Sequence, residues 1–191
     1  MKKVFCIATA LLVVFASCKK DKDDVVKPAE ASAISKTFFQ TIPVTIAATG
    51  SGTFEYGFKF VVTQNGKIAQ LGSRMPDAGA YRVTVWDASV TPKVILGSAN
   101  ITQPAGAITY QPITPISLTA GKDYFISVWS SGRWYEIRPA TAATFAYPIT
   151  LGSVSIKGYQ WIGSPVVPQG FPSNAETSYV AGVPDFEFQP D

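Results

Sequence analysis

Regular alternation of apolar and polar residues is the dominant pattern of this chain, and it predicts β-strands. Between positions 54 and 63, every even-numbered residue from Phe54 to Val62 is apolar, whereas Glu55, Lys59 and Thr63 occupy odd positions. Successive side chains of a strand point to opposite faces, so a period of two gives one buried and one mostly polar face. Residues 54–63 are therefore predicted to form a strand with the even-numbered side chains in a core.

Comparable runs follow along the chain, separated by turn-forming residues. They predict strands at residues 67–74, 80–86, 94–102, 108–118, 122–129, 134–138, 154–161 and 179–188. Asn65-Gly66 favours a hairpin turn, because both residues tolerate positive φ, and 67–74 would then pair with 54–63. The 14 prolines and 15 glycines leave almost no stretch long enough for an amphipathic helix. The spacing predicts an all-β fold: an antiparallel β-sandwich, jelly-roll-like, of about eight or nine strands.

The first 18 residues have a different pattern, that of an export signal. Two lysines precede an apolar run at residues 4–16, which as a helix is roughly 20 Å long and too short for a bilayer core of roughly 30 Å. The sequence Phe15-Ala16-Ser17-Cys18 resembles the lipobox of bacterial lipoproteins. That resemblance implies a signal peptide at residues 1–17 and a lipid on the Cys18 thiol. An ordinary secretory signal with a chance cysteine, or a buried N-terminal helix, is the alternative.

Residues 18–36 are predicted to be a flexible tether, followed by a single β-sandwich domain at residues 37–191. The tether is charged and then rich in alanine, with little to bury. Its charges at 20–24 are similar to those of Bacteroidetes-type lipoproteins, in which they look like a signal for export to the cell surface. We therefore expect a lipid-anchored outer-membrane protein of the cell envelope, with periplasmic and surface-exposed placement both open.

Composition excludes several kinds of chemistry. The chain has no histidine, and its two cysteines, Cys6 and Cys18, both lie at or before the lipidation point. A Ser-His-Asp triad, a histidine or cysteine zinc site and a disulfide in the domain are therefore excluded. Without residues 1–17, Lys+Arg falls from 16 to 14 against 13 Asp+Glu, which leaves a formal charge of +1. The cations are scattered, so we expect no nucleic-acid partner, and no cofactor or metal is indicated.

Residues 54–135 resemble a family of bacterial secreted domains, the domain-of-unknown-function family 4082. The similarity is carried by Tyr56-Gly57-Phe58-Lys59-Phe60, Gly66-Lys67-Ile68, Tyr81–Ala88 and Leu118–Tyr124. It covers about 80 of the 174 residues that follow the signal peptide. The resemblance implies a β-sandwich similar to carbohydrate-binding modules, in proteins of the bacterial envelope. The family has no settled activity, so it implies a fold and a setting but no mechanism.

Aromatic residues are the only side chains that suggest a ligand, since flat rings stack on the C–H faces of sugars. Strand alternation places Trp86 and Trp129 on the more polar faces of their strands. We predict a shallow glycan- or peptide-binding surface lined by Trp129, Arg133, Trp134, Tyr135 and Trp161. The alternative is that these rings pack beneath residues 144–175 as a second layer of core.

Carboxylates give little support for catalysis. A glycosidase needs two facing carboxyl groups, and Glu55, Asp123 and Glu136 are the candidates that could supply them. The domain contains no Asp-x-Asp-x-Asp spacing of the kind that binds calcium. The expected function is therefore non-enzymatic: a membrane-anchored binding module for a glycan or a surface protein. A structural or adhesive subunit that acts by assembly is the first alternative, and a carboxylate-based glycoside hydrolase is the second.

Overall fold

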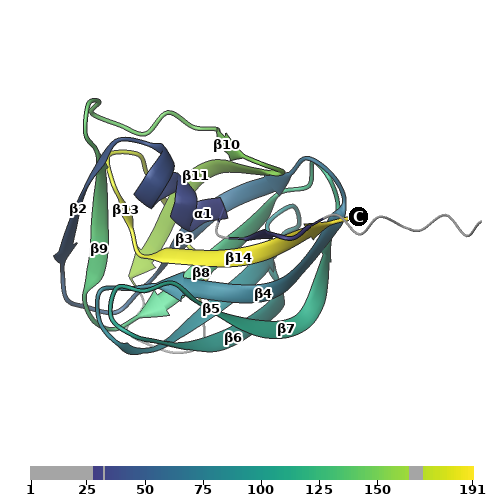
Figure 1. Ribbon diagram of the computed structural model, residues 1–191, viewed down its shortest axis with the longest axis horizontal. Coiled ribbons are helices and arrows are strands. Elements are labelled where there is room, and N and C mark those ends of the chain that lie inside the picture. The colour runs from purple at the N-terminus through teal and green to yellow at the C-terminus, as the bar shows by residue number, and fades with distance from the viewer. Residues whose placement is uncertain (1–27, 32, 164–169) are drawn as a thin grey trace, which may run out of the picture.

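The computed structural model describes residues 28–31, 33–163 and 170–191, and these residues form an antiparallel β-sandwich (Figure 1). The elements are β1 (Glu30–Ala31), α1 (Ala33–Lys36), the π-helical turn η1 (Thr37–Thr41), β2 (Val44–Thr49), β3 (Phe54–Val62), β4 (Gly66–Arg74), β5 (Gly79–Asp87), β6 (Val94–Gln103), β7 (Thr109–Leu118), β8 (Tyr124–Ser130), β9 (Trp134–Pro139), β10 (Ile149–Leu151), β11 (Val154–Gly163), β12 (Asn174–Glu176), β13 (Val180–Ala181) and β14 (Val183–Pro190). The predicted all-β sandwich is confirmed.

Three sheets make up the sandwich. The largest has seven strands in the order β10-β11-β3-β8-β5-β6, with β12 also paired to β11. A four-stranded sheet, β1-β14-β4-β7, and a three-stranded sheet, β13-β9-β2, pack on its inner face. All strand pairs are antiparallel.

The core lies where the period-two pattern predicts it. On β3, the side chains of Tyr56, Phe58, Phe60 and Val62 are all buried in one hydrophobic cluster. Phe60 packs against Phe186 of β14 with 4.8 Å between ring centroids, which joins the seven-stranded sheet to the four-stranded one. The even-numbered residues of β3 therefore face inward, as the alternation predicts.

The turn at Asn65-Gly66 is a corner between two sheets and not a hairpin. Strand β3 pairs with β11 and β8, whereas β4 pairs with β14 and β7. The Asn65 side chain accepts a hydrogen bond from the Ala120 amide (2.9 Å), and its carbonyl accepts one from the Asp191 amide (3.0 Å). The hairpin prediction is wrong because β3 and β4 each pair with strands distant in the sequence and not with each other. Asn65 bonds to residues next to those distant strands.

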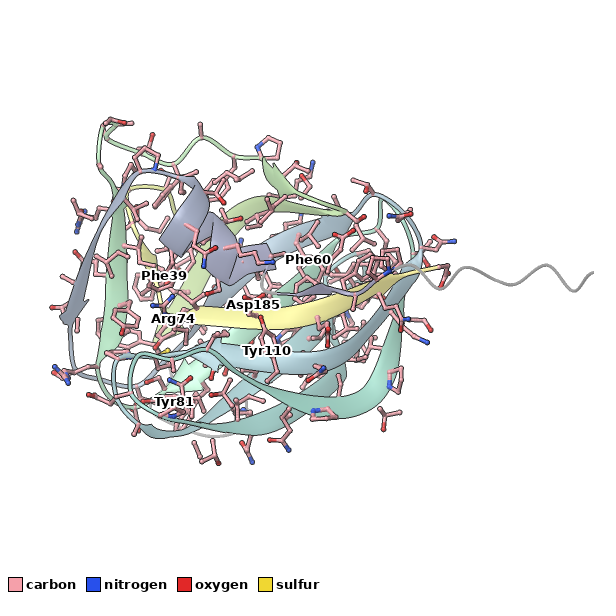
Figure 2. All side chains as sticks on the ribbon, viewed as in Figure 1. Phe39, Phe60, Arg74, Tyr81, Tyr110 and Asp185 are labelled. Atoms are coloured by element: carbon pink, nitrogen blue, oxygen red, sulfur yellow. The ribbon has the colours of Figure 1, made fainter. Side chains whose placement is uncertain are left out.

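The folded part of the chain begins before the predicted boundary at residue 37. Ile34 of α1 is fully buried, and β1 pairs with β14 at Glu187 and Phe188. The buried Asp185 carboxylate accepts hydrogen bonds from the amides of Ile34 (3.3 Å) and Ser35 (2.9 Å), and it lies between α1 and Tyr110 in Figure 2. A short segment that looks too poor in apolar residues to fold is thus held by strand pairing, by the burial of Ile34 and by a buried carboxylate acceptor.

The predicted strand at 179–188 is interrupted at Gly182. There the chain leaves the three-stranded sheet as β13 and enters the four-stranded sheet as β14. Gly182 has φ of 62°, and a Cβ atom on it would lie 2.0 Å from the Tyr56 ring. Glycine is therefore required both for the turn and for the close approach to Tyr56. This interruption places Tyr179 and Ala181 beside β3.

The two ends of β3 mark opposite ends of the sandwich. Eight residue steps from Phe54 to Val62 correspond to about 26 Å of strand. The Val62 end is also where the chain termini of the described part lie, since β1 pairs near the end of β14 and the Asp191 amide bonds to Asn65. Figure 1 shows both of these termini at one end, with β2, β9 and β13 toward the other.

Candidate functional site

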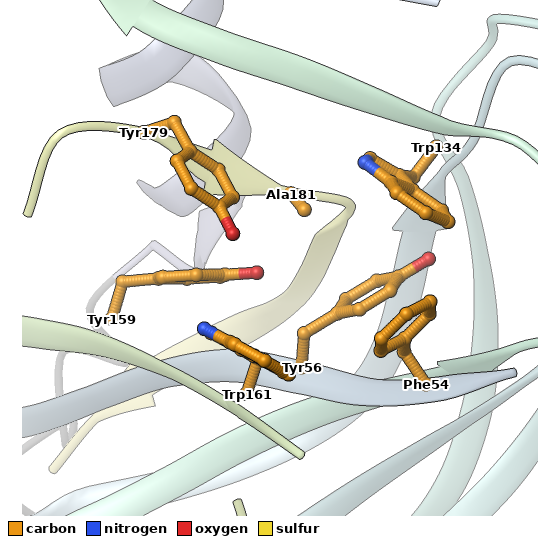
Figure 3. Close-up of a pocket in the computed structure, with 7 residues that line it drawn as sticks. All are labelled: Phe54, Tyr56, Trp134, Tyr159, Trp161, Tyr179 and Ala181. Carbon is orange, nitrogen blue, oxygen red and sulfur yellow. The ribbon is translucent and has the colours of Figure 1, made fainter. Parts of the chain in front are cut away.

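A pocket lined almost entirely by aromatic side chains opens near the Phe54 end of β3 (Figure 3). Its volume is about 160 Å³. We call it the aromatic pocket; it is lined by Phe54, Tyr56, Trp134, Tyr159, Trp161, Tyr179 and Ala181. None of these seven residues carries a charge at neutral pH.

Strand register brings the pocket residues together from four parts of the chain. Tyr56 of β3 is paired with Trp161 of β11, and both face inward. A β-bulge between Ile156 and Gly158 shifts the register of β11, so that Tyr159 and Trp161 face the same side as Ile156. Trp134 comes from the start of β9, on the opposite layer, and faces the β3 side chains.

Edge-to-face ring contacts fix the walls of the aromatic pocket. Phe54 contacts Trp134 at 5.1 Å and 77° and Trp161 at 5.9 Å and 70° between ring centroids and planes. The Tyr159 and Tyr179 rings are tilted by 54° to each other, with 6.4 Å between their centroids. Rings at these distances and angles attract each other beyond the burial of their area. The pocket walls are therefore held in place without a ligand.

The aromatic pocket has a partly exposed rim and a buried floor. Phe54, Trp134, Trp161 and Tyr179 are half-buried, whereas Tyr56 and Tyr159 are each only 2% exposed. In Figure 3 the hydroxyl groups of Tyr159 and Tyr179 project into the space between the rings. The rim offers ring faces to a ligand, and the hydroxyl groups of the floor lie beneath them.

The hydroxyl groups of Tyr56 and Tyr159 are buried and have no hydrogen-bond partner. Burial raises the pKa of both tyrosines far above the ordinary value. Ser130 lies near the Tyr56 hydroxyl and the Ala181 backbone near that of Tyr159, and both oppose the rise, but neither contact has hydrogen-bond geometry. A buried hydroxyl without a partner costs free energy, about 1–3 kcal/mol in proteins, and both hydroxyl oxygens are almost inaccessible to solvent.

The structure brings together only two of the predicted site residues, Trp134 and Trp161. Trp129 lies on the outer face of the seven-stranded sheet, with the Arg82 guanidinium carbon 5.5 Å from its ring centroid. Arg133 is exposed and forms a two-fold ion pair with Asp77, which lowers the pKa of that carboxyl. Tyr135 faces away from Trp134 and packs edge-on against Phe39 at 5.6 Å. Cys18 lies outside the described residues.

Phe54, Tyr56, Tyr159 and Tyr179 line the pocket but were not among the predicted site residues. Alternation correctly assigns Phe54 and Tyr56 to the inner face of β3, a position that normally indicates core. No sequence signal shows that β11 pairs with β3 so that Trp161 lies opposite Tyr56, or that Gly182 turns Tyr179 toward them.

A second group of aromatic, charged and hydroxyl-bearing side chains lies on the outer face of the seven-stranded sheet. We call it the outer-face cluster: Glu55, Arg82, Trp86, Ser127 and Trp129. The Trp86 indole donates to the Ser127 hydroxyl (3.0 Å), which donates to Glu55 (2.5 Å), and Arg82 pairs with the same carboxylate at 3.2 Å. Burial raises the pKa of Glu55, although the Ser127 hydrogen bond and the Arg82 charge oppose that rise.

The three carboxylates considered for hydrolysis are each bound to a different cation. Glu55 pairs with Arg82, Asp123 with Lys59 at 2.7 Å, and Glu136 with Arg138 at 2.7 Å. Glu136 belongs to β9 in the opposite layer of the sandwich. Within residues 28–31, 33–163 and 170–191, no three or more His, Cys, Asp or Glu side chains are grouped to hold a metal ion. In the same residues, no helix is long and apolar enough to cross a membrane.

No protein-family model and no curated protein matches this chain. The similarity to the domain-of-unknown-function family 4082 and to lipoprotein leaders therefore stays a prediction from the sequence.

Proposed function

We propose that this protein is a lipid-anchored, non-catalytic binding module of the bacterial cell envelope, and that the aromatic pocket binds a glycan. One observation carries the glycan assignment: half-buried aromatic rings surround a small uncharged space whose floor holds two buried, unpartnered hydroxyl groups. Sugars present both apolar C–H faces and hydroxyl groups, so they match the rim and the floor together.

The glycan proposal is tested with the full chain, purified in detergent micelles, on a glycan array. Binding of an array glycan that Trp161→Ala weakens at least about tenfold would support it. The matched control is Trp129→Ala, which removes a tryptophan from the outer face of the same sheet and should leave binding intact. Absence of binding to any glycan, or equal loss with both variants, would contradict the proposal.

The anchoring proposal rests on Cys18 and the apolar run before it. Cells labelled with a radioactive fatty acid should incorporate label into the protein, and Cys18→Ser should remove the label and release the protein from the membrane fraction. Two or three acyl chains anchor a protein stably in a membrane, whereas a single chain binds only weakly. A Cys18→Ser protein that stays with the membrane would contradict lipid anchoring.

Assembly is a second candidate function, and strand β6 favours it. This strand is an edge of the seven-stranded sheet, carries no charged residue, and exposes Val94 (48%), Ile95 (44%) and Leu96 (37%) in succession. Uncharged apolar edges pair readily with other strands, whereas the edge strand β7 carries Pro112 and Pro115, which hinder pairing. We therefore propose β6 as the contact strand if the protein self-associates.

The molar mass of the full chain in detergent, measured by light scattering over a range of concentrations, tests this second candidate. A dimer that Ile95→Lys dissociates would support it. Ile46→Lys is the matched control, because Ile46 is equally exposed (42%) on the edge strand β2. A monomer at all concentrations would contradict assembly through β6 and would leave the glycan proposal untouched.

A further inference from the structure

We infer that the aromatic pocket recognises one uncharged sugar ring at the end of a glycan chain, and not a stretch of rings within the chain. This inference deepens the proposed glycan-binding function and rests on it. Three features of the pocket carry it: its volume, its closed floor and its lack of charge.

The volume of the aromatic pocket fits a single ring. A closed apolar cavity of about 150 Å³ holds one benzene molecule, and the pocket measures about 160 Å³. Binding sites for larger organic ligands usually have volumes of about 300–1,000 Å³. A sugar ring with its hydroxyl groups is larger than benzene, so one ring takes up the whole pocket and a second ring of the same chain stays outside the rim.

The floor of the aromatic pocket is closed by backbone. Tyr56, Tyr159 and Ala181 are all buried, and Ala181 is paired with Glu136 in the three-stranded sheet. Directly after Ala181, the Gly182 backbone lies against the Tyr56 ring and donates a hydrogen bond to the Tyr135 carbonyl (3.1 Å). A ring can therefore enter past the rim, but a chain cannot pass through, so the bound ring must be terminal.

The pocket favours an uncharged ring. Its lining contains no Lys, Arg, Asp or Glu. The cation that packs on the Tyr179 ring is Arg138, 5.3 Å from its centroid, and this guanidinium is already paired with Glu136 at 2.7 Å. Moving an ionised group into such surroundings without a partner is costly. A uronic acid or a phosphorylated sugar should therefore bind more weakly than its neutral counterpart.

The two buried hydroxyl groups supply the hydrogen bonds. Each tyrosine hydroxyl can donate one hydrogen bond and accept others, and those of Tyr56 and Tyr159 have no partner in the protein. Both oxygens are almost inaccessible to solvent, so a small shift of the surrounding rings is needed before a sugar hydroxyl can bond to either, but no existing partner is displaced. Because the Tyr159 hydroxyl makes no hydrogen bond in the protein, removal of that atom should affect binding and not folding.

The experiment uses the full chain in detergent and a panel of single-ring methyl glycosides of glucose, galactose, mannose, xylose, fucose and N-acetylglucosamine. Binding is followed by intrinsic tryptophan fluorescence, to which Trp134 and Trp161 contribute, and by saturation-transfer NMR. We expect at least one neutral glycoside to bind. Adding one further ring to that glycoside should change its dissociation constant less than about threefold. The corresponding uronic acid should bind at least about tenfold more weakly, an effect comparable to leaving one buried polar group without a partner.

Tyr159→Phe tests the floor, and Tyr135→Phe is its matched control on the opposite face of β9. We expect Tyr159→Phe to weaken binding about 2–10-fold, the worth of one net hydrogen bond, with a melting temperature unchanged or raised. Tyr135→Phe should leave binding unchanged. A purely structural role for the Tyr159 hydroxyl would lower the melting temperature and leave the affinity of the folded fraction unchanged.

The outcomes separate this inference from the proposed function. If array glycans bind but no single ring does, or if glycans with a blocked terminal ring bind as well as free ones, recognition of the chain end is wrong and the glycan-binding function stands. If neither the array nor the panel shows binding, both are wrong. Binding of a single neutral ring with equal affinity for its uronic acid would overturn the charge argument.

Discussion

The aromatic pocket and the outer-face cluster lie on opposite faces of one sheet, and each contains two of the four tryptophans. In the outer-face cluster, Trp86 is almost fully buried against Phe125 and Phe171, and its indole belongs to a chain of hydrogen bonds that ends at Glu55. In the aromatic pocket, Trp134 and Trp161 are half-exposed, and the hydroxyl groups near them have no partner.

The difference teaches how to separate aromatic residues that stabilise from those that bind. The outer-face cluster contains a buried charge that its neighbours pair and bond, although the indole of Trp129 and the Arg82 Nε each lack an acceptor. The pocket contains ring faces that the protein leaves open. Variants of the cluster should therefore change stability, whereas variants of the pocket should change binding.

The largest expected effect comes from Glu55→Ala, which removes the carboxylate and leaves Arg82 without its partner. Loss of one partner from a buried ion pair costs about 3 kcal/mol at the lower end of its range, which suits Arg82 because its side chain is 18% exposed. Chemical denaturation would measure the loss. Glycan affinity of the folded protein should not change, and a loss of affinity at full stability would break the comparison.

Acidity provides the next largest effect, because it acts on the buried carboxyls and not on the pocket. Burial raises the pKa of Asp185 to about 6, although three amides and the Tyr110 hydroxyl donate to it. Between about pH 4 and 6 the folded protein therefore binds this proton more tightly than the unfolded chain does. The free energy of unfolding should fall as pH rises through this window, by up to about 3 kcal/mol at about 1.4 kcal/mol per unit of pKa.

Chemical denaturation of the wild type and of Asp185→Asn at several pH values would measure this contribution. The free energy of unfolding should fall less steeply with pH in the variant than in the wild type. Glu55, whose pKa is also raised, contributes in the same direction in both proteins. Glycan affinity should stay constant from pH 5 to 8, because the lining groups that can titrate are tyrosines with raised pKa values. A glycan affinity that changes with pH in the same way as the free energy of unfolding would show that the pocket is coupled to the buried carboxyl groups.

Trp161→Ala should have its main effect on binding. The side chain is half-buried at the pocket rim and contacts Phe54, so its loss should cost about 1–2 kcal/mol of stability, less than for a fully buried tryptophan. We expect at least tenfold weaker glycan binding, about 1.4 kcal/mol. Calorimetric titration measures the affinity, and thermal unfolding measures the stability; a variant that fails to fold would place Trp161 with the core.

Arg133→Ala should have the smallest effect of all. Arg133 is exposed and paired with Asp77, and it belongs neither to the lining of the aromatic pocket nor to the outer-face cluster. Exposed ion pairs contribute little to stability, so we expect no measurable change in unfolding or in glycan affinity. A clear loss of binding would extend the site beyond the aromatic pocket and return Arg133 to it.

The sequence predicts the strands better than their partners. Period-two alternation identifies the inward residues of β3 and the outward position of Trp86 and Trp129, because side-chain direction is a local property. It does not identify the partner of β4, since the Asn65-Gly66 turn favours a hairpin locally and the structure pairs β4 with the C-terminal strand β14. Pairing over more than a hundred residues leaves no local signal.

The candidate site shows the same division. Trp134 and Trp161 were predicted as ligand residues, and both line the aromatic pocket. Arg133, Trp134 and Tyr135 are adjacent in the sequence, but their side chains point in different directions. Tyr135 packs on Phe39 on the other face of β9, and Arg133, in the turn before β9, pairs with Asp77. The positions of Tyr159, Tyr179 and Ala181 depend on the bulge in β11 and on the turn at Gly182, which only the folded structure reveals.

The two described chain ends share one end of the sandwich, and this determines how far the aromatic pocket lies from a point of attachment. Pro28 and Asp191 leave from the Val62 end of β3, while the aromatic pocket lies at the Phe54 end, about 26 Å along the strand. A molecule attached through its N-terminal segment therefore has its pocket at the end of the sandwich that is farther from the point of attachment. A fluorescent label or a sensor-chip linkage at the C-terminus would keep the same orientation, whereas one in the turn at Ser131-Gly132 would place the support beside the rim.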